Sequence, residues 1–321
     1  MTTTNQQREP GTSGFEEGPR VPRREDDDLR DQASRAIPGS QQAPQEQARP
    51  RAEDGGGRDL EVFRGLAEDA GAGLEGARME ELLTPFLGLL QPLSPQLDSG
   101  SPAYMEQAKQ GMFVNTVTGQ LFDGRTGLDV VPCAREYLYG EWTPRDAGGG
   151  FHGQRGPDDP EVRELLAKQG RFKKLLTPRN TELIEQFNVY AIVGPPGFAA
   201  GEGEQVVLSF TSTKMKVYKV WFNQIGHIKY PYQGRTITPA MWAHRWRLTS
   251  VRQENEKGVF WNYQIRLANG DNPRDSLVLP NDPLFEAGKD FSELVRSGRV
   301  KADYDTAAAG AGETDPDAAP F

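Results

Sequence analysis

The 321-residue sequence has a single cysteine, Cys133, three histidines, and no apolar run that approaches the length of a membrane span. One thiol excludes an internal disulfide framework and a metal site built from several cysteines, and it fits a reducing compartment. A spanning helix needs about 20 mostly apolar residues. The first residues, MTTTNQQREPGTSG, also lack the apolar core of a secretory signal. We therefore expect a cytoplasmic protein without a membrane partner.

The sequence also lacks a recognisable catalytic constellation. His152, His227 and His244 are far apart and show no ligand spacing, and Cys133 has no nearby histidine. The glycine-rich stretch GPPGFAAGEG (194–203) lacks the Lys-Ser/Thr of a phosphate-binding loop. We therefore expect no metal, no cofactor and no enzymatic activity. A nuclease stays open as an alternative, because carboxylates dispersed along a sequence can converge in a fold.

Apolar residues make up 36% of the chain, below the 45–50% or so that is usual for globular domains. Residues 1–57 are almost free of large apolar side chains and cannot offset the entropy of ordering, so they predict a disordered arm. Residues 58–300 predict one β-rich domain, with a helical lead-in over 58–98. Residues 301–321 predict a disordered acidic tail.

Short alternating or apolar segments dominate the domain, and turn residues separate them. They predict a hairpin over 111–124, β structure over 127–145 with a break near Pro132, and strands over 187–194, 204–210, 242–251 and 258–269. Helices are predicted over 160–168, 214–226 and 283–297, the second capped by residues 211–213. A strand is the alternative for KMKVYKVWF (214–222), because Val and Tyr favour sheets. The fold class is mainly β (α+β): an OB-like small barrel or a bent antiparallel sheet with a few helices, flanked by disordered termini.

Charge is distributed unevenly along the chain. Residues 205–267 contain ten Lys or Arg and two Glu, hence +8, whereas the whole protein carries −9, which leaves −17 for the remainder. The same segment contains eleven aromatic residues, including four of the five tryptophans. Single-stranded nucleic acid needs both features, because cations neutralise phosphates and aromatic faces stack on unpaired bases.

Two sets of residues are candidates for contacts to single-stranded DNA. The expected phosphate contacts are Lys214, Lys216, Lys219, Lys229, Arg235, Arg245, Arg247 and Arg266. The expected stacking platforms are Trp221, Tyr230, Tyr232, Trp242, Trp246, Trp261 and Tyr263. The alternative is that these aromatics form a core and the cations a solvated face, since aromatic residues in strands are often buried.

The C-terminal segment 302–321 has five acids and no base. If the domain has a basic groove, this tail can occupy it until nucleic acid displaces it. Its last residues, ETDPDAAPF, resemble the C-terminal tip of bacterial and phage single-stranded DNA-binding proteins. The resemblance implies an OB-fold body and recruitment of phage or host replication and recombination proteins through Asp315, Asp317, Pro320 and Phe321.

Three further segments, GMFVNTVTGQLFDGRTGLDVVPC, YGEWTPRDAGGGF and FTSTKMKVYKVW, are similar to a family of tailed-phage proteins encoded among replication genes. The resemblance implies a phage protein that acts in the host cytoplasm. Together these observations predict a sequence-nonspecific single-stranded DNA-binding protein of phage DNA replication or recombination. The alternative is a virion-associated or scaffold-type structural protein with a basic face that contacts nucleic acid.

Overall fold

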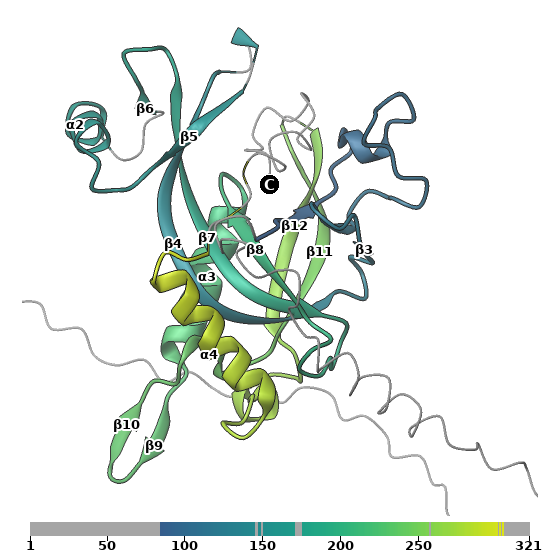
Figure 1. The fold of residues 1–321 in the computed structure, drawn as a ribbon, viewed down its shortest axis with the longest axis vertical. Helices are drawn as coiled ribbons and strands as arrows, with labels where there is room; N and C mark the ends of the chain where they lie inside the picture. The colour runs from purple at the N-terminus through teal and green to yellow at the C-terminus, as the bar shows by residue number, and fades with distance from the viewer. Residues whose placement is uncertain are drawn as a thin grey trace, which may run out of the picture. The chain divides into compact units, whose positions relative to one another are not determined.

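The computed structural model describes residues 84–144, 147–148, 150–170, 175–256, 258–300, 302 and 304 (Figure 1). The strands are β1 (Leu87–Leu89), β2 (Phe113–Asn115), β3 (Leu121–Phe122), β4 (Leu128–Trp142), β5 (Phe151–Arg155), β6 (Leu175–Leu176), β7 (Glu182–Gly194), β8 (Glu204–Phe210), β9 (Tyr230–Tyr232), β10 (Arg235–Ile237), β11 (Trp246–Asn255) and β12 (Gly258–Leu267). The helices are α2 (Pro160–Gln169), α3 (Lys214–His227) and α4 (Pro283–Arg296), with short 3-10 turns η2 (Pro95–Leu97), η4 (Met241–Ala243) and η5 (Pro273–Ser276).

The two long antiparallel strands β4 and β7 form the centre of the sheet, and β4 is paired with β7 from Asp129 to Trp142. At one end of this pair, β11 and β12 extend the sheet beyond β4, and β8 lies on the other edge, against β7. At the other end, β5 pairs with β4 and β6 with β7. The described part of the chain is therefore mainly β and antiparallel with a strong bend, and none of its sheets closes into a barrel (Figure 1).

The break predicted near Pro132 is a β-bulge within one continuous strand. Pro132 pairs with Ala191 and Ala134 with Tyr190, so Cys133 is an extra residue without a partner on β7. Proline has no N–H to donate to a ladder and is tolerated in a strand at such an irregularity. The bulge lets Val131, Cys133 and the following Ala134 all contribute to the same core.

Alternate residues of β7 point into two different cores. Val189, Ala191 and Val193 join the first core, which α3 covers, and the small sheet of β1, β2 and β3 contributes to it. Tyr190 and Ile192 join the second core, which α4 covers. A sheet buried on both faces explains why the predicted strands 187–194 and 204–210 read as nearly continuous apolar runs.

Helix ends follow the sequence signals in two of three cases. Asp159 accepts hydrogen bonds from the N–H groups of Glu161 and Val162 at the start of α2, and Asp282 caps α4 in the same way. Helices α2 and α4 both have proline in the first turn. Helix α3 differs, because Thr213 has helical backbone angles and makes no side-chain cap.

Two further expectations need correction. The described part of the predicted helical lead-in contains strand β1 and the short turn η2, and residues 58–83 lie outside the described range. The predicted strand 242–251 begins only at Trp246, because Met241–Ala243 form the turn η4. The 1–57 arm also lies outside the described range. None of the helices seen here is long and apolar enough to cross a bilayer.

Candidate nucleic-acid interface

A two-stranded ribbon, β9 and β10, projects from the body below α3 and α4 in Figure 1. Its turn residues Gln233 and Gly234 both have positive φ, 47° and 73°. Two consecutive positive φ angles characterise the turn whose twist matches that of the flanking strands in a tight hairpin. The sequence analysis missed this ribbon, because its strands are only three residues long and lack a buried face.

The two faces of the ribbon differ in chemistry. Tyr230 pairs with Ile237 and Tyr232 with Arg235, so these four side chains lie on one face. Tyr232 is 49% exposed and Arg235 is also exposed. The other face carries Pro231 and Thr236. One face of the ribbon therefore places an exposed aromatic ring directly beside a guanidinium group.

Tyr230 anchors the root of the ribbon to the body. Its hydroxyl lies 2.8 Å from Nε2 of the buried His244, and the two rings are nearly parallel. The guanidinium of Arg274 lies over the Tyr230 ring, 5.8 Å from its centre. Burial raises the pKa of Tyr230 and lowers the pKa of His244 to about 4, so His244 is neutral at pH 7.

Beside the root of the ribbon lies a pocket of about 570 Å³ at the C-terminal end of α3. Its lining includes three cationic side chains, Lys229, Arg266 and Arg274, and one acid, Asp271. Tyr230 contributes an aromatic ring, and Gln224, His227 and Asn272 contribute polar groups. The volume suits a ligand of nucleotide size, and the excess of cations favours an anionic one.

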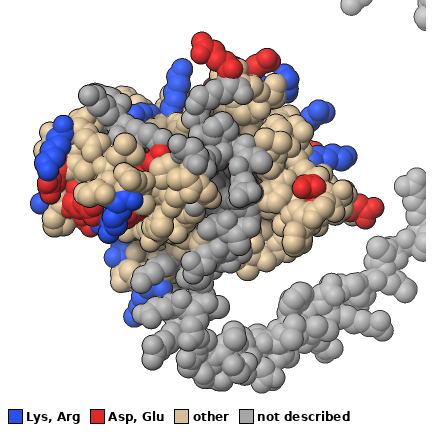
Figure 2. Space-filling view, turned by 90° about the horizontal axis from the view of Figure 1, so that it is seen from above, with Lys and Arg blue, Asp and Glu red and all other residues tan. Residues whose placement is uncertain are grey.

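Helix α3 extends this basic surface along the body. Tyr218 and Trp221 face the first core, whereas Lys216, Lys219 and His227 are exposed. Neither lysine makes a salt bridge or a side-chain hydrogen bond within the described residues. Between Glu204 and Glu254 the sequence contains no acid at all. In contrast, the face of the molecule seen in Figure 2 carries acidic and basic side chains side by side.

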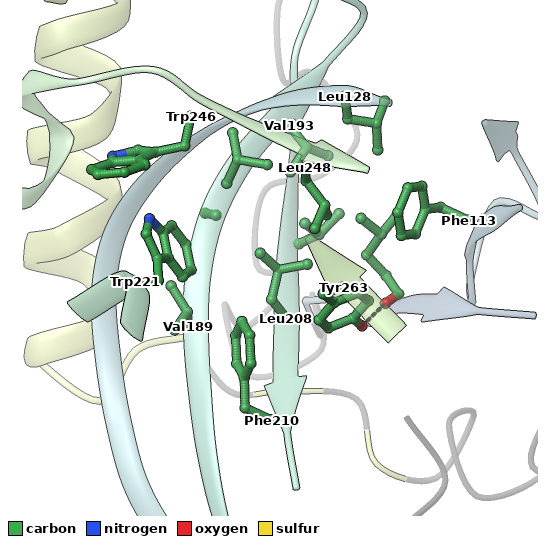
Figure 3. Close-up of a cluster of buried hydrophobic side chains, with 14 of the residues drawn as sticks. Phe113, Leu128, Val189, Val193, Leu208, Phe210, Trp221, Trp246, Leu248 and Tyr263 are labelled. Atoms are coloured by element: carbon green, nitrogen blue, oxygen red, sulfur yellow. Dashed lines mark hydrogen bonds between the residues drawn. The ribbon is translucent and has the colours of Figure 1, made fainter. Parts of the chain in front are cut away.

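Three of the predicted stacking platforms are core residues. Trp221 and Trp246 are 1% exposed and Tyr263 is 2% exposed, and all three belong to the first core (Figure 3). Trp221 meets Trp246 edge to face with ring centres 6.0 Å apart. Packing of α3 onto β11 and β12 buries these rings, so they have no free face for a base, and the alternative interpretation as core holds for them.

The other two tryptophans are half-buried. Trp261 packs against the first core, and its ring lies so close over Gly111 that a Cβ there would approach it to 2.5 Å. Trp242 packs against the second core and meets Phe285 edge to face. Of the seven predicted platforms, Tyr230 and Tyr232 are therefore the ones that lie on the ribbon. Trp246 also lines the pocket, but it is only 1% exposed.

Three of the predicted phosphate contacts have structural roles. Lys214 is 8% exposed, and its ammonium group lies 4.6 Å from the centre of the Tyr263 ring. Arg245 lies over the Phe198 ring at 4.7 Å. Nε of Arg247 lies 2.6 Å from Oδ1 of the buried Asp129. Neutralisation by a carboxylate and partial burial remove these cations from the expected set.

The remaining cations form the candidate interface: Lys216, Lys219, Lys229, Arg235 and Arg266, all exposed. The sequence analysis missed Arg274, because it lies between two acids in DNPRD, outside the basic segment. Only the fold brings it next to Tyr230.

The predicted partner tip, Asp315, Asp317, Pro320 and Phe321, lies outside the described residues. Over the ranges that are described, no cluster of His, Cys, Asp and Glu is arranged to hold a metal ion.

These features define a β-rich domain that presents a basic ribbon and pocket on one side. The chain belongs to the family of Pam3 phage gp34-like proteins, whose family model matches residues 56–301. This match confirms the phage origin that the sequence resemblance implied. Comparisons with curated proteins and with solved structures gave no match.

Proposed function

We propose that this protein binds single-stranded DNA without sequence specificity, during phage DNA replication or recombination, through the ribbon and the adjoining pocket. The observation that carries the proposal is the one-sided ribbon face, where exposed Tyr232 pairs across the strands with Arg235. An aromatic ring beside a guanidinium group gives a base a surface on which to stack, and the guanidinium group can contact the phosphate of the same nucleotide.

The pocket extends this arrangement toward the body. Tyr230 belongs both to the ribbon face and to the pocket lining, so an aromatic stripe runs from the exposed tip into a cationic cavity. Lys229, Arg266 and Arg274 supply positive charge along this path. Single strands can place bases on exposed rings, whereas the bases of a duplex are already stacked. The proposal therefore predicts a preference for single strands.

The test is a fluorescence-anisotropy titration of a labelled oligo-dT with the full chain at several salt concentrations. Removing one stacked base contact costs about 1–3 kcal/mol, so Tyr232→Ala should weaken binding roughly 5- to 150-fold. Arg235→Ala should make the negative slope of log K against log salt less steep by about 0.7, the contribution of one phosphate contact on a single strand.

Thr236→Ala is the matched control, because Thr236 is equally exposed on the opposite face of the same ribbon. It should leave both affinity and salt slope unchanged. If Tyr232→Ala and Thr236→Ala bind equally well, the ribbon face is not the binding surface. Equal affinity of the unaltered chain for duplex DNA would refute the preference for single strands. Together with recovery of the protein in purified particles, it would favour the virion-associated alternative.

A further inference from the structure

A patch of polar side chains lies buried in the face of the sheet that otherwise forms the second core. Along this face of β7, the apolar Ile192 and Tyr190 are followed by Asn188 and Gln186, and Ser209 of β8 pairs with Asn188. Asn188 is 0% exposed, Ser209 2% and Gln186 3%. Within the patch, Nε2 of Gln186 donates to Oδ1 of Asn188 at 2.8 Å and to Oγ of Ser209 at 3.0 Å. Nδ2 of Asn188 finds no acceptor among these three side chains, and a buried amide donor is costly without one, so the patch needs an acceptor from elsewhere.

The acceptor is the hydroxyl of Tyr304, near the C-terminal end of the described residues. The hydroxyl of Tyr304 lies 3.0 Å from Nε2 of Gln186 and also accepts a hydrogen bond from Nδ2 of Asn188. Its ring stacks on Phe151, with ring centres 5.1 Å apart and planes inclined by 11°, and meets the edge of Phe86 at 4.9 Å. We call this arrangement the Tyr304 socket.

The donors of the socket suit a carbonyl oxygen better than a hydroxyl. Nδ2 of Asn188 donates to this oxygen, and Nε2 of Gln186 shares its two hydrogens among this oxygen, Oδ1 of Asn188 and Oγ of Ser209. The Tyr304 O–H then has no acceptor among the described residues, whereas a carbonyl oxygen carries no hydrogen that needs one. A flat ring with a carbonyl group, stacked on an aromatic side chain, is the chemistry of a nucleobase.

We propose that the Tyr304 socket is a second binding site, for a nucleobase that carries a ring carbonyl, and that Tyr304 occupies it when no base is bound. Thymine, cytosine and guanine have such a carbonyl, and adenine does not. The proposal rests on the proposed function to the extent that a bound strand supplies the base. It differs in place, because the socket lies on β7 and β8 and not on the ribbon.

Occupation by a base also has a consequence for the C-terminal segment. Ala302 forms a bridge to Thr84, and Tyr304 follows two residues later, so these two contacts attach the end of the fold to its beginning. A base that takes the socket must expel Tyr304. Base binding would therefore release the point from which the acidic tail starts.

The test uses Tyr304→Ala in the full chain, whose empty socket can be filled from solution. Thermal unfolding is followed with thymidine, deoxyadenosine or p-cresol, the free form of the lost side chain. We expect thymidine and p-cresol to raise Tm by about 3–6 °C at roughly ten times their Kd, and deoxyadenosine to leave it unchanged. The matched control adds Asn188→Leu, which keeps the branched shape of the side chain but removes its donor and its acceptor, and it should abolish the thymidine shift.

Stabilisation by p-cresol without stabilisation by thymidine would overturn the proposal and leave Tyr304 as a structural anchor. If Tyr304→Ala does not fold, hydrogen exchange of residues 302–304 in the unaltered chain decides. Exchange there should rise with saturating oligo-dT and not with oligo-dA, and equal exchange would refute the site. Thymidine has no phosphate and does not need the ribbon, so adding Tyr232→Ala should leave the thymidine-induced rise in Tm intact. Failure of the Tyr304 socket as a base site is therefore distinguishable from failure of the ribbon as the binding surface for single strands.

Discussion

Replacing His244 should change how the stability of the protein depends on pH. His244 is 2% exposed, and its Nε2 meets the hydroxyl of Tyr230 at the root of the ribbon. Burial lowers its pKa from 6.5 to about 4. Between these two pH values the unfolded chain binds a proton that the folded chain does not, so stability falls as pH falls through this window.

The size of the effect follows from the two pKa values. At about 1.4 kcal/mol for each pH unit between them, His244 should account for a loss of up to about 3 kcal/mol between pH 7 and pH 4. His244→Gln keeps a hydrogen-bonding group but cannot titrate. Its free energy of unfolding should therefore decrease less than that of the unaltered chain over the same range.

Urea unfolding at closely spaced pH values measures this difference by linear extrapolation. Thr236→Ala is the control, because Thr236 is exposed and does not titrate, so its replacement should leave the pH profile parallel to that of the unaltered chain. If the profiles of His244→Gln and the unaltered chain run parallel from pH 7 to pH 4, the argument from burial is refuted.

Two further predictions concern charge. Asp129→Ala should lower the free energy of unfolding by about 3–5 kcal/mol in chemical denaturation, because Asp129 pairs with Arg247 at 2.6 Å and accepts from the Gly197 N–H at 2.7 Å. Asp129→Asn should lower the free energy of unfolding by less, and equal losses in the two variants would argue against a charge effect. Removing residues 305–321, which spares Tyr304, should tighten oligo-dT binding at low salt if the acidic tail competes for the basic surface, and unchanged affinity would eliminate tail competition.

Much of the local structure could be predicted from the sequence. The hairpin at 111–124, the strands β7 and β8 and the helices α2 and α4 lie where alternation and apolar spacing predict them. The excess of Lys and Arg over residues 205–267 also indicated a basic segment. These properties depend on residues near one another in the chain, which is why they can be read without the fold.

Which residues form the site was decided by contacts between distant segments. Alternation indicates that Trp246 and Leu248 share a face, but only the packing of α3 shows that this face is covered. Arg247 looks like a free cation until the fold brings Asp129 to it from 118 residues away. Burial and pairing are properties of long-range packing, so the sequence by itself determined the composition of the basic segment, and the tertiary structure decided which of its side chains can meet a ligand.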